Sequence, residues 1–266
     1  MSTQNKAVVL FIGDIVGKPG RRILAENLEN WREEWNVDFV IVNGENAAGG
    51  FGLTVNAVKK FRRYGVDLIT SGNHILDRKD EIPAVLQEDI VLRPENYVDI
   101  PGKGVWSGEI AGVSALVFNL EGLIFMEEEP KRVNPFKKAL EIVENSSEVI
   151  KILDFHAETT AEKIAMGWLL NGRVSAVLGT HTHVQTADER ILPGGTLYIT
   201  DVGMTGPFDS VIGMDKEGII RRFITGESER MKIAEDDIRM NAVLLEIDKD
   251  TGKGISIRRI EIGFDS

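Results

Sequence analysis

The sequence contains no cysteine, and this absence removes several classes of chemistry at once. Disulfide scaffolds, zinc ribbons and thiol nucleophiles all need the missing side chain. Any metal site in this chain must therefore be built from nitrogen and oxygen ligands. Histidine is scarce as well, because the 266 residues include only four. A function that depends on histidine has few positions available to it.

Long apolar runs and net positive charge are also missing. No segment approaches the roughly 20 apolar residues that a membrane-spanning helix needs. Residues Met1 to Lys6 lack the basic start and apolar core of a signal peptide, so we expect a cytoplasmic protein. The net charge of -11 repels nucleic-acid backbones and anionic membranes, and we expect neither an extended nucleic-acid duplex nor a membrane as a partner. A phosphate substrate would need a local cationic centre.

The organisation of the chain predicts one α/β domain over residues 1–266, because no Ser/Pro/Gly-rich linker or long charge run divides it. Apolar, β-branched runs such as Ala7 to Ile12 predict buried strands of a parallel sheet. Helical stripes between the strands predict helices that flank the sheets. One such helix, which follows Thr159, is expected to turn Trp168 inward.

The C-terminal part predicts a different arrangement. The apolar segments 242–247 and 255–262 are separated by a glycine-containing turn, which predicts an antiparallel hairpin at the edge of a sheet. The apolar phase shifts at Arg258 and Arg259, where we expect a β-bulge. The polar segment 225–239 is predicted to be a loop or an exposed turn.

Polar side chains follow several of the predicted strands, at the points where α/β proteins build their sites. Carboxylate and amide oxygens and imidazole nitrogens suit two borderline divalent ions such as iron, manganese or zinc. In an extended backbone, His181 and His183 point the same way, which would let them contact neighbouring ions. The candidate residues are Asp14, Glu45, Asn46, Asn73, His74, His156, His181 and His183.

Charge and alternative roles both bear on this prediction. Asp14 and Glu45 supply two negative charges against four from two divalent ions, so the centre would stay positive and attract a phosphate. Taken singly, each residue has another role open to it: Asp14 could cap a helix, and an asparagine could close a turn. Asp201 could orient a ligand histidine or close the turn after its strand. The ordered combination of all of them favours a metal centre.

The same residues carry a family resemblance. The motifs around Asp14, Glu45, Asn73, His156 and His181 resemble those of the calcineurin-like metallophosphoesterases. The closest resemblance is to the bacterial YmdB subgroup, and it covers nearly the whole chain. It rests on segments 11–21, 43–50, 154–158 and 200–206. The resemblance implies a metallophosphoesterase-like layered fold of β-sheets flanked by helices.

The resemblance also implies a ligand set and a mechanism. Two divalent ions per chain are expected, with iron or manganese first and zinc as the alternative. His74 is expected to be the general acid, and a metal-bridged hydroxide would attack phosphorus. One ion would be held by Asp14, Asn46 and His183, and the other by Asn73, His156 and His181, with Glu45 bridging.

Two positions depart from the broad superfamily pattern. Val16 stands where a ligand histidine is usual, and the subgroup resemblance implies Asn46 as the substitute. Ile75 stands where an acidic residue usually follows the catalytic histidine, so the orienting partner of His74 must come from elsewhere. Asp77 is the candidate that the sequence offers.

The implied activity is phosphodiester hydrolysis of cyclic nucleotides, notably 2′,3′-cyclic and also 3′,5′-cyclic AMP. Segments 49–52 and 205–209 are the candidate rim loops that would select the substrate. A phosphomonoesterase, a nucleotide-binding regulatory protein with little turnover and a dinuclear amidase or peptidase are the alternatives. Homo-oligomerisation stays open, since soluble enzymes often form symmetric assemblies.

Overall fold

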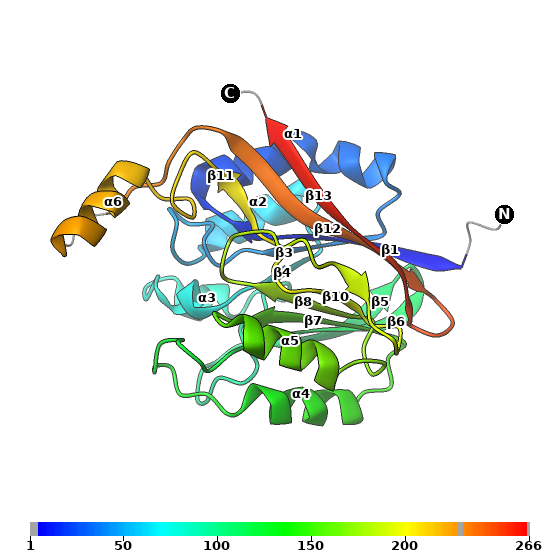
Figure 1. Cartoon of the computed structure of the whole chain (residues 1–266). Coiled ribbons are helices and arrows are strands. Elements are labelled where there is room, and N and C mark those ends of the chain that lie inside the picture. The colour runs from blue at the N-terminus through cyan, green and yellow to red at the C-terminus, as the bar shows by residue number, and fades with distance from the viewer. Residues whose placement is uncertain (1–4, 228–230, 265–266) are drawn as a thin grey trace.

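Two β-sheets lie face to face, with helices over the outer face of each, in the computed structural model of the protein, which describes residues 5–227 and 231–264 (Figure 1). The first sheet has seven strands in the order β2-β11-β12-β1-β3-β4, with β13 also paired to β12. Its strands are β1 (Lys6–Ile12), β2 (Asp14–Ile15), β3 (Phe39–Asn43), β4 (Leu68–Thr70), β11 (Met204–Pro207), β12 (Ile238–Asp248) and β13 (Gly254–Phe264).

The second sheet has six strands in the order β5-β6-β7-β8-β10-β9. These are β5 (Val105–Ile110), β6 (Val113–Glu121), β7 (Ile150–His156), β8 (Ala176–Thr180), β9 (Arg190–Ile191) and β10 (Leu197–Ile199). Strands β6, β7, β8 and β10 run parallel, as do β1, β3 and β4 of the first sheet. Each sheet therefore presents a row of carboxyl-terminal strand ends at one edge.

The helices cover the outer faces of this sandwich. Figure 1 shows α1 and α2 over the first sheet and α4 and α5 under the second. The helical elements are α1 (Gly17–Glu34), α2 (Val55–Tyr64), a 3-10 turn η1 (Asn73–Leu76), α3 (Ile82–Val85), α4 (Pro135–Glu144), α5 (Thr160–Leu169) and α6 (Lys216–Thr225). Thr54 caps α2 by accepting a hydrogen bond from the amide of Ala57, 3.2 Å away.

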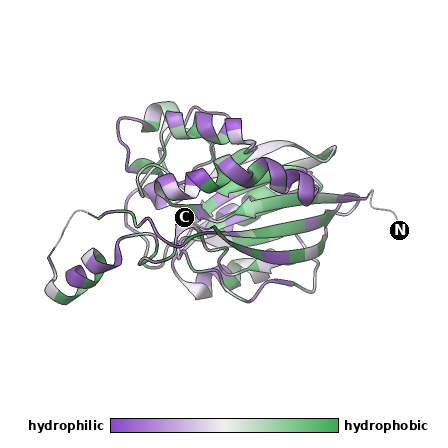
Figure 2. Cartoon of the chain, turned by 90° about the horizontal axis from the view of Figure 1, so that it is seen from above, coloured by the Kyte–Doolittle hydropathy of each residue, from purple (hydrophilic) through white to green (hydrophobic). Residues whose placement is uncertain are grey.

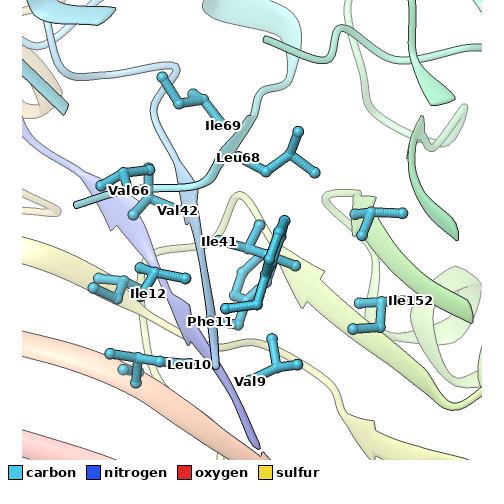
Figure 3. Packing of buried hydrophobic residues seen from close by; sticks show 14 of the residues in the cluster. Val9, Leu10, Phe11, Ile12, Ile41, Val42, Val66, Leu68, Ile69 and Ile152 are labelled. Carbon is cyan, nitrogen blue, oxygen red and sulfur yellow. The ribbon is translucent and has the colours of Figure 1, made fainter. Parts of the chain in front are cut away.

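The core lies between the sheets because successive side chains of a strand point to opposite faces. Figure 3 shows Val9 and Phe11 of β1 on the side that faces Ile152 of β7, whereas Leu10 and Ile12 lie on the opposite side. All five side chains are fully buried. Figure 2 shows hydrophobic strands beneath helices whose outer faces are hydrophilic. The strand register thus fixes which residues reach the space between the sheets.

Two local predictions are wrong. The sequence predicts that Trp168 faces inward from α5, but it is 52% exposed, and Lys163 and Met166 are buried instead. The hairpin β12–β13 forms, with β13 at the sheet edge, but its register shifts at Glu246 and Ile247 rather than at the arginine pair. The extra residue of the bulge is Ile255, so the arginine pair remains in regular pairing with β12.

The region before β12 holds an element that the sequence did not predict. Helix α6 ends at Thr225, the first residue of the segment 225–239, and the described residues between it and the start of β12 at Ile238 lie outside helices and strands. Residues 228–230 of that segment and residues 1–4 of the expected leader-free N-terminus lie outside the described part. Within that part, no helix is long and apolar enough to cross a membrane. The single domain and the cytoplasmic location stay predictions.

Candidate metal centre

The candidate residues meet where the strand ends of both sheets come together. Asp14 opens β2, and Glu45 and Asn46 follow β3 directly. Asn73 and His74 open η1 after β4. From the second sheet come His156, the last residue of β7, and the pair after β8, His181 and His183. The structure therefore brings together side chains that are up to 169 residues apart. It does so because the carboxyl ends of the parallel strands of both sheets lie at the same edge of the molecule.

One cluster forms around the Nε2 atom of His156. That atom lies 3.1 Å from Glu45 Oε1, 3.1 Å from Asn73 Oδ1 and 3.0 Å from His181 Nδ1. Gly72 permits this approach, because a Cβ there would lie 2.1 Å from the His156 ring. Four potential ligand atoms from four loops thus converge on one point.

A second cluster adjoins the first through Glu45. The amide nitrogen of Asn46 lies 3.2 Å from Glu45 Oε1 and 3.2 Å from His183 Nε2. Asp14 is fully buried; its Oδ2 accepts a bond from the His181 amide at 3.4 Å. Its Oδ1 has no hydrogen-bond partner among the described residues. A buried carboxylate oxygen without a partner is costly, which is the condition that a bound cation would relieve.

The donor set fits divalent metal ions. Among the described residues, Glu45, His156 and His181 offer ligand atoms that all lie within 4.8 Å of one another. Two imidazole nitrogens at 3.0 Å, beside a carboxylate and an amide oxygen, match the ligand types of iron, manganese and zinc. The structure thus contains a candidate metal site, and the division of ligands between two ions stays a prediction.

The buried charges of these two clusters favour a positive charge next to Glu45. Burial alone would raise the pKa of Glu45, but the charge of His156 and its hydrogen bond lower that pKa below its usual value. Burial opposes a charged His156 ring, yet Glu45 raises the pKa of His156 to about 9. Burial and then the charge of His156 lower the pKa of His181 to about 3. His181 is therefore neutral at neutral pH, which is the form that binds metals.

His74 lies at the rim of the site rather than within the ligand cluster. Its backbone amide donates to Glu45 Oε2 at 3.1 Å, while its ring packs edge-on against Phe51 with centroids 5.0 Å apart. Its Nδ1 lies 2.8 Å from Asp77 Oδ2. The carboxylate that the sequence offered as orienting partner thus occupies that position, because the 3-10 turn brings residues three apart onto one face.

The loop that carries His181 and His183 is held in a strained conformation. Both histidines have positive φ angles, 98° and 65°, which residues other than glycine rarely adopt. Between them, the amide and hydroxyl of Thr182 donate to Asp201 Oδ2 at 3.1 and 2.6 Å. The same oxygen accepts a bond from buried Lys163 at 2.7 Å. Asp201 therefore fixes the histidine loop through Thr182 instead of contacting a histidine.

Several contacts within the candidate site escaped the sequence analysis. Glu158, two residues after His156, lies 3.0 Å from Nε2 of His181 and fixes that ring from the solvent side. Thr180 lies 2.9 Å from Nδ1 of His156 and donates in turn to buried Asp154 at 2.7 Å. The spacing His156-x-Glu158 after a strand was the available signal, since alternate residues share a face.

The base of α6 also contacts the site. Nδ1 of His183 lies 3.1 Å from the carbonyl oxygen of Ile212. Ile212 has a φ of 45°, and this β-branched residue is an outlier there. With Nδ1 occupied by the carbonyl, Nε2 of His183 is left as the ligand atom that faces Asn46.

Comparisons with known proteins agree with this architecture. A 2′,3′-cyclic-nucleotide 2′-phosphodiesterase from Bacillus subtilis strain 168 is 45% identical over 260 residues, which cover 97% of each chain. A crystal structure of a hypothetical protein from Thermus thermophilus has a TM-score of 0.90 at 41% identity and covers 97% of this chain and 100% of that one.

A novel phosphatase from Mycoplasma pneumoniae has a TM-score of 0.94 at 37% identity, over 98% of this chain and 95% of that one. The predicted α/β fold of the metallophosphoesterase type, with two sheets flanked by helices, is confirmed. The family model described as YmdB-like protein matches residues 10–260. The chain therefore belongs to the YmdB-like protein family.

Proposed function

We propose that this protein is a metal-dependent phosphoric diester hydrolase that acts on cyclic nucleotides, with 2′,3′-cyclic nucleotides as the first substrate class. The observation that carries the proposal is the convergence of carboxylate, amide and imidazole ligand atoms from both sheets around His156 and Glu45. The name of the Bacillus subtilis relative supports the substrate class. Hydrolysis of 3′,5′-cyclic AMP is the second activity that we propose.

The ligand residues divide into two groups around Glu45 in this proposal. Asp14, Asn46 and His183 would hold one ion, and Asn73, His156 and His181 the other. Bound ions would supply Lewis acidity and a nucleophile derived from water. The chain's own contribution is to keep these side chains dehydrated and oriented, since Asp14, Glu45 and His156 are fully buried and Asn46 is 2% exposed.

His74 is assigned the role of general acid. The Asp77 carboxylate faces Nδ1, so that nitrogen carries a proton in the charged ring and the Nε2 proton is the one available for transfer. The ring lies beside the ligand cluster but contacts no ion-binding group through its side chain in the described contacts. In a 2′,3′-cyclic substrate cut at the 2′ ester, an oxygen derived from water would bond to phosphorus as the phosphorus–O2′ bond breaks, O2′ would take the Nε2 proton, and a 3′-phosphate would remain.

The test combines metal content with turnover on one sample. Purified protein should contain about two transition-metal ions per chain by elemental analysis and should hydrolyse 2′,3′-cyclic AMP in a metal-dependent manner. His74→Gln should keep the metal and lose about 10²- to 10⁴-fold in kcat, the usual contribution of a general acid. Loss of metal from His74→Gln would make His74 a ligand. A protein that stays inactive after reconstitution with iron or manganese would overturn the catalytic proposal.

A phosphomonoesterase is the second candidate, because the Mycoplasma pneumoniae structure is described as a phosphatase. The ligand cluster would serve both reactions, and the loops around it would decide which substrate enters. Parallel assays with a chromogenic monoester and a chromogenic diester separate the two activities by their kcat/KM values. Stoichiometric binding of a cyclic nucleotide that stays intact in the loaded protein would instead indicate a regulatory binding protein.

A further inference from the structure

An aromatic side chain lies beside His74 at the rim of the candidate metal centre. The ring of Phe51 meets the His74 ring edge-on, and the two ring centroids are 5.0 Å apart. Phe51 is neither buried nor fully exposed. Within residues 5–227 and 231–264, no other aromatic ring and no guanidinium group stacks on it. Part of the ring is therefore accessible to a group that enters the site.

The loop that carries Phe51 is a tight turn. Gly49, Gly50 and Gly52 have φ angles of 73°, 91° and 76°, a region that glycine adopts without steric cost. The amide of Ala48 closes the turn by donating to the carbonyl of Gly52 at 3.0 Å. The backbone around Phe51 is thus held by its own hydrogen bond and by residues that suit its conformation.

Two arginines hold this turn from outside. The Arg78 guanidinium donates to the Phe51 carbonyl at 3.0 Å and also to the carbonyl of Ala48. Arg21, near the start of α1, donates to a further carbonyl of the same segment. Arg78 lies four residues after His74, so the segment that carries the proposed general acid also holds the loop of Phe51. The two rings are therefore kept in a fixed relation before a substrate arrives.

The place of the base in a nucleotide substrate follows from the oxygen that leaves. In the proposed reaction, O2′ would take its proton from His74. O2′ is bonded to C2′, C2′ to C1′, and C1′ to the base, so the base is three covalent bonds away from the leaving oxygen. A nucleotide whose O2′ reaches the His74 ring must therefore place its base close to that ring. Phe51 is the aromatic side chain in contact with His74 in the described part of the chain.

We propose that the nucleobase of the substrate stacks on the ring of Phe51, which makes Phe51 a specificity-determining residue. This inference rests on the proposed function, because it needs a nucleotide that is cut at its 2′ ester. Every base has a flat π-face, so an aromatic ring can bind all of them, and the larger purine rings bury more area than pyrimidines. Purine 2′,3′-cyclic nucleotides are thus the preferred substrates.

The other rim loop offers a weaker candidate. Phe208 lies in the segment 205–209, but the guanidinium group of Arg239 lies over its ring, 5.2 Å from the centroid. A base would have to displace that cation or use the opposite face of the ring. Among the described contacts, none joins Phe208 to His74. The geometry therefore favours Phe51 over Phe208.

The experiment compares three substrates that share the cyclic phosphate and differ in the group on C1′. They are 2′,3′-cyclic AMP, 2′,3′-cyclic CMP and the 2′,3′-cyclic phosphate of 1-O-methylribose, which has no base. Wild type should hydrolyse them with kcat/KM values that fall in that order. In Phe51→Ala, the KM for 2′,3′-cyclic AMP should rise at least about fivefold at nearly unchanged kcat, whereas kcat/KM for the base-free diester should change less than about twofold.

Two further variants serve as controls. Phe51→Tyr keeps the aromatic ring and should retain the wild-type order of the three substrates. Trp168→Ala removes an exposed aromatic side chain from α5, which covers the outer face of the second sheet (Figure 1). It should leave all the kinetic values unchanged. A loss of base preference in Phe51→Tyr as well would show that the aromatic face is not what recognises the base.

A binding measurement separates this inference from the proposed function. By calorimetry, 3′-AMP, the expected product, should bind wild type at least about fivefold more tightly than Phe51→Ala. Equal binding would overturn the role of Phe51, and so would a wild type that hydrolyses the base-free diester as well as 2′,3′-cyclic AMP; the hydrolase proposal would survive both results.

Two other outcomes have distinct meanings. An equal fall in kcat for all three substrates in Phe51→Ala would overturn the inference, because Phe51 would then only support the ring of His74. A wild type that hydrolyses none of the three would overturn the proposed function, and the comparison of 3′-AMP binding would still decide whether Phe51 holds a base.

Discussion

The histidine loop after β8 and helix α6 are 33 residues apart in sequence, counted from His183 to Lys216, yet they are held in opposite ways. His183 is buried, and its ring is fixed by Asn46 on one side and Ile212 on the other. Helix α6 is exposed along its length, and the contacts that tie it to the chain lie at its surface: the Asp215 amide donates to the Lys232 carbonyl at 2.8 Å, Lys216 pairs with Asp209, and Arg222 Nη1 lies 3.8 Å from Met231 Sδ. Contacts from several elements can hold strained residues, whereas a helix of 10 residues without packing is marginal in water.

The difference implies that the geometry of the site depends on the whole fold, whereas α6 depends on few contacts with the rest of the chain. Local opening is expected to be easiest where apolar contacts are few. Substitutions in the histidine region should therefore affect metal binding, activity and stability together. Substitutions at the exposed positions of α6 should leave all three nearly unchanged.

The largest effect should follow Glu45→Ala, which removes the carboxylate between the two ligand groups. We expect loss of bound metal and at least a 10³-fold loss of turnover, roughly 4 kcal/mol of transition-state stabilisation. Elemental analysis and 2′,3′-cyclic AMP hydrolysis on the same preparation measure both effects. Glu141→Ala is the control, since that carboxylate is 61% exposed on α4, where it pairs with Lys138. Full metal content in Glu45→Ala would contradict the bridging assignment.

The next effect in size is on stability. Lys163→Met should destabilise the protein by about 3–5 kcal/mol, because it leaves the buried carboxylate of Asp201 without its cation. The midpoint of urea denaturation measures this change. Lys163 is a positioning residue, so metal affinity in the folded variant should fall as well, since the loop of His181 and His183 loses its anchor. Lys151→Met, at a half-exposed position of β7, is the comparison variant.

A smaller effect should follow Asp77→Asn. The amide weakens the hydrogen bond to Nδ1 of His74, and we expect about a tenfold fall in kcat, the equivalent of roughly 1.4 kcal/mol. KM and metal content should stay unchanged, because Asp77 makes no described contact with the ligand cluster. An equal fall in a His74→Gln background would show that Asp77 acts by a route other than His74.

The smallest effect should come from α6. Phe223 is 83% exposed, so Phe223→Ser should change the free energy of unfolding by less than about 0.5 kcal/mol, as for other exposed positions. Chemical denaturation measures the change. A loss of about 2 kcal/mol or more, well beyond that range, would show that α6 packs on its own chain, and the contrast between the two regions would fail.

The sequence predicts the strands and the edge where their polar residues collect, because buried parallel strands have a clear apolar pattern. It also offers Asp77 as the partner of His74, and the structure places the two side chains in contact. The sequence does not predict which residues of α5 are buried. The helical stripe predicts Trp168 as a core residue, whereas Lys163 is the residue that is buried. Its ammonium group is stabilised by the buried carboxylate of Asp201, which lies far away in the sequence.

Helix α6 and the bulge were missed for different reasons. The apolar residues of α6 lie in a short stretch with Gly218 near its start, which weakens the helical pattern, although Asp215 before it and Gly226 after it are typical helix boundary residues. The bulge is placed by the pairing of β13 with β12, at Ile255, rather than by the arginines that interrupt the apolar alternation. Pairing partners decide register, and a single segment does not contain that information.

The pairing of the first strand with the twelfth sets the order in which the molecule can be completed during synthesis. Lys6 of β1 pairs with Asp248 of β12, and the pairing continues to Ile12 and Ala242. A growing chain that has passed His183 already contains every candidate ligand, but β1 still lacks its antiparallel neighbour. At the usual rates of about 5–20 residues per second, the remaining 65 residues to Asp248 take several seconds. The edge of β1 that later pairs with β12 therefore stays open to pairing with other chains while the nascent protein is on the ribosome.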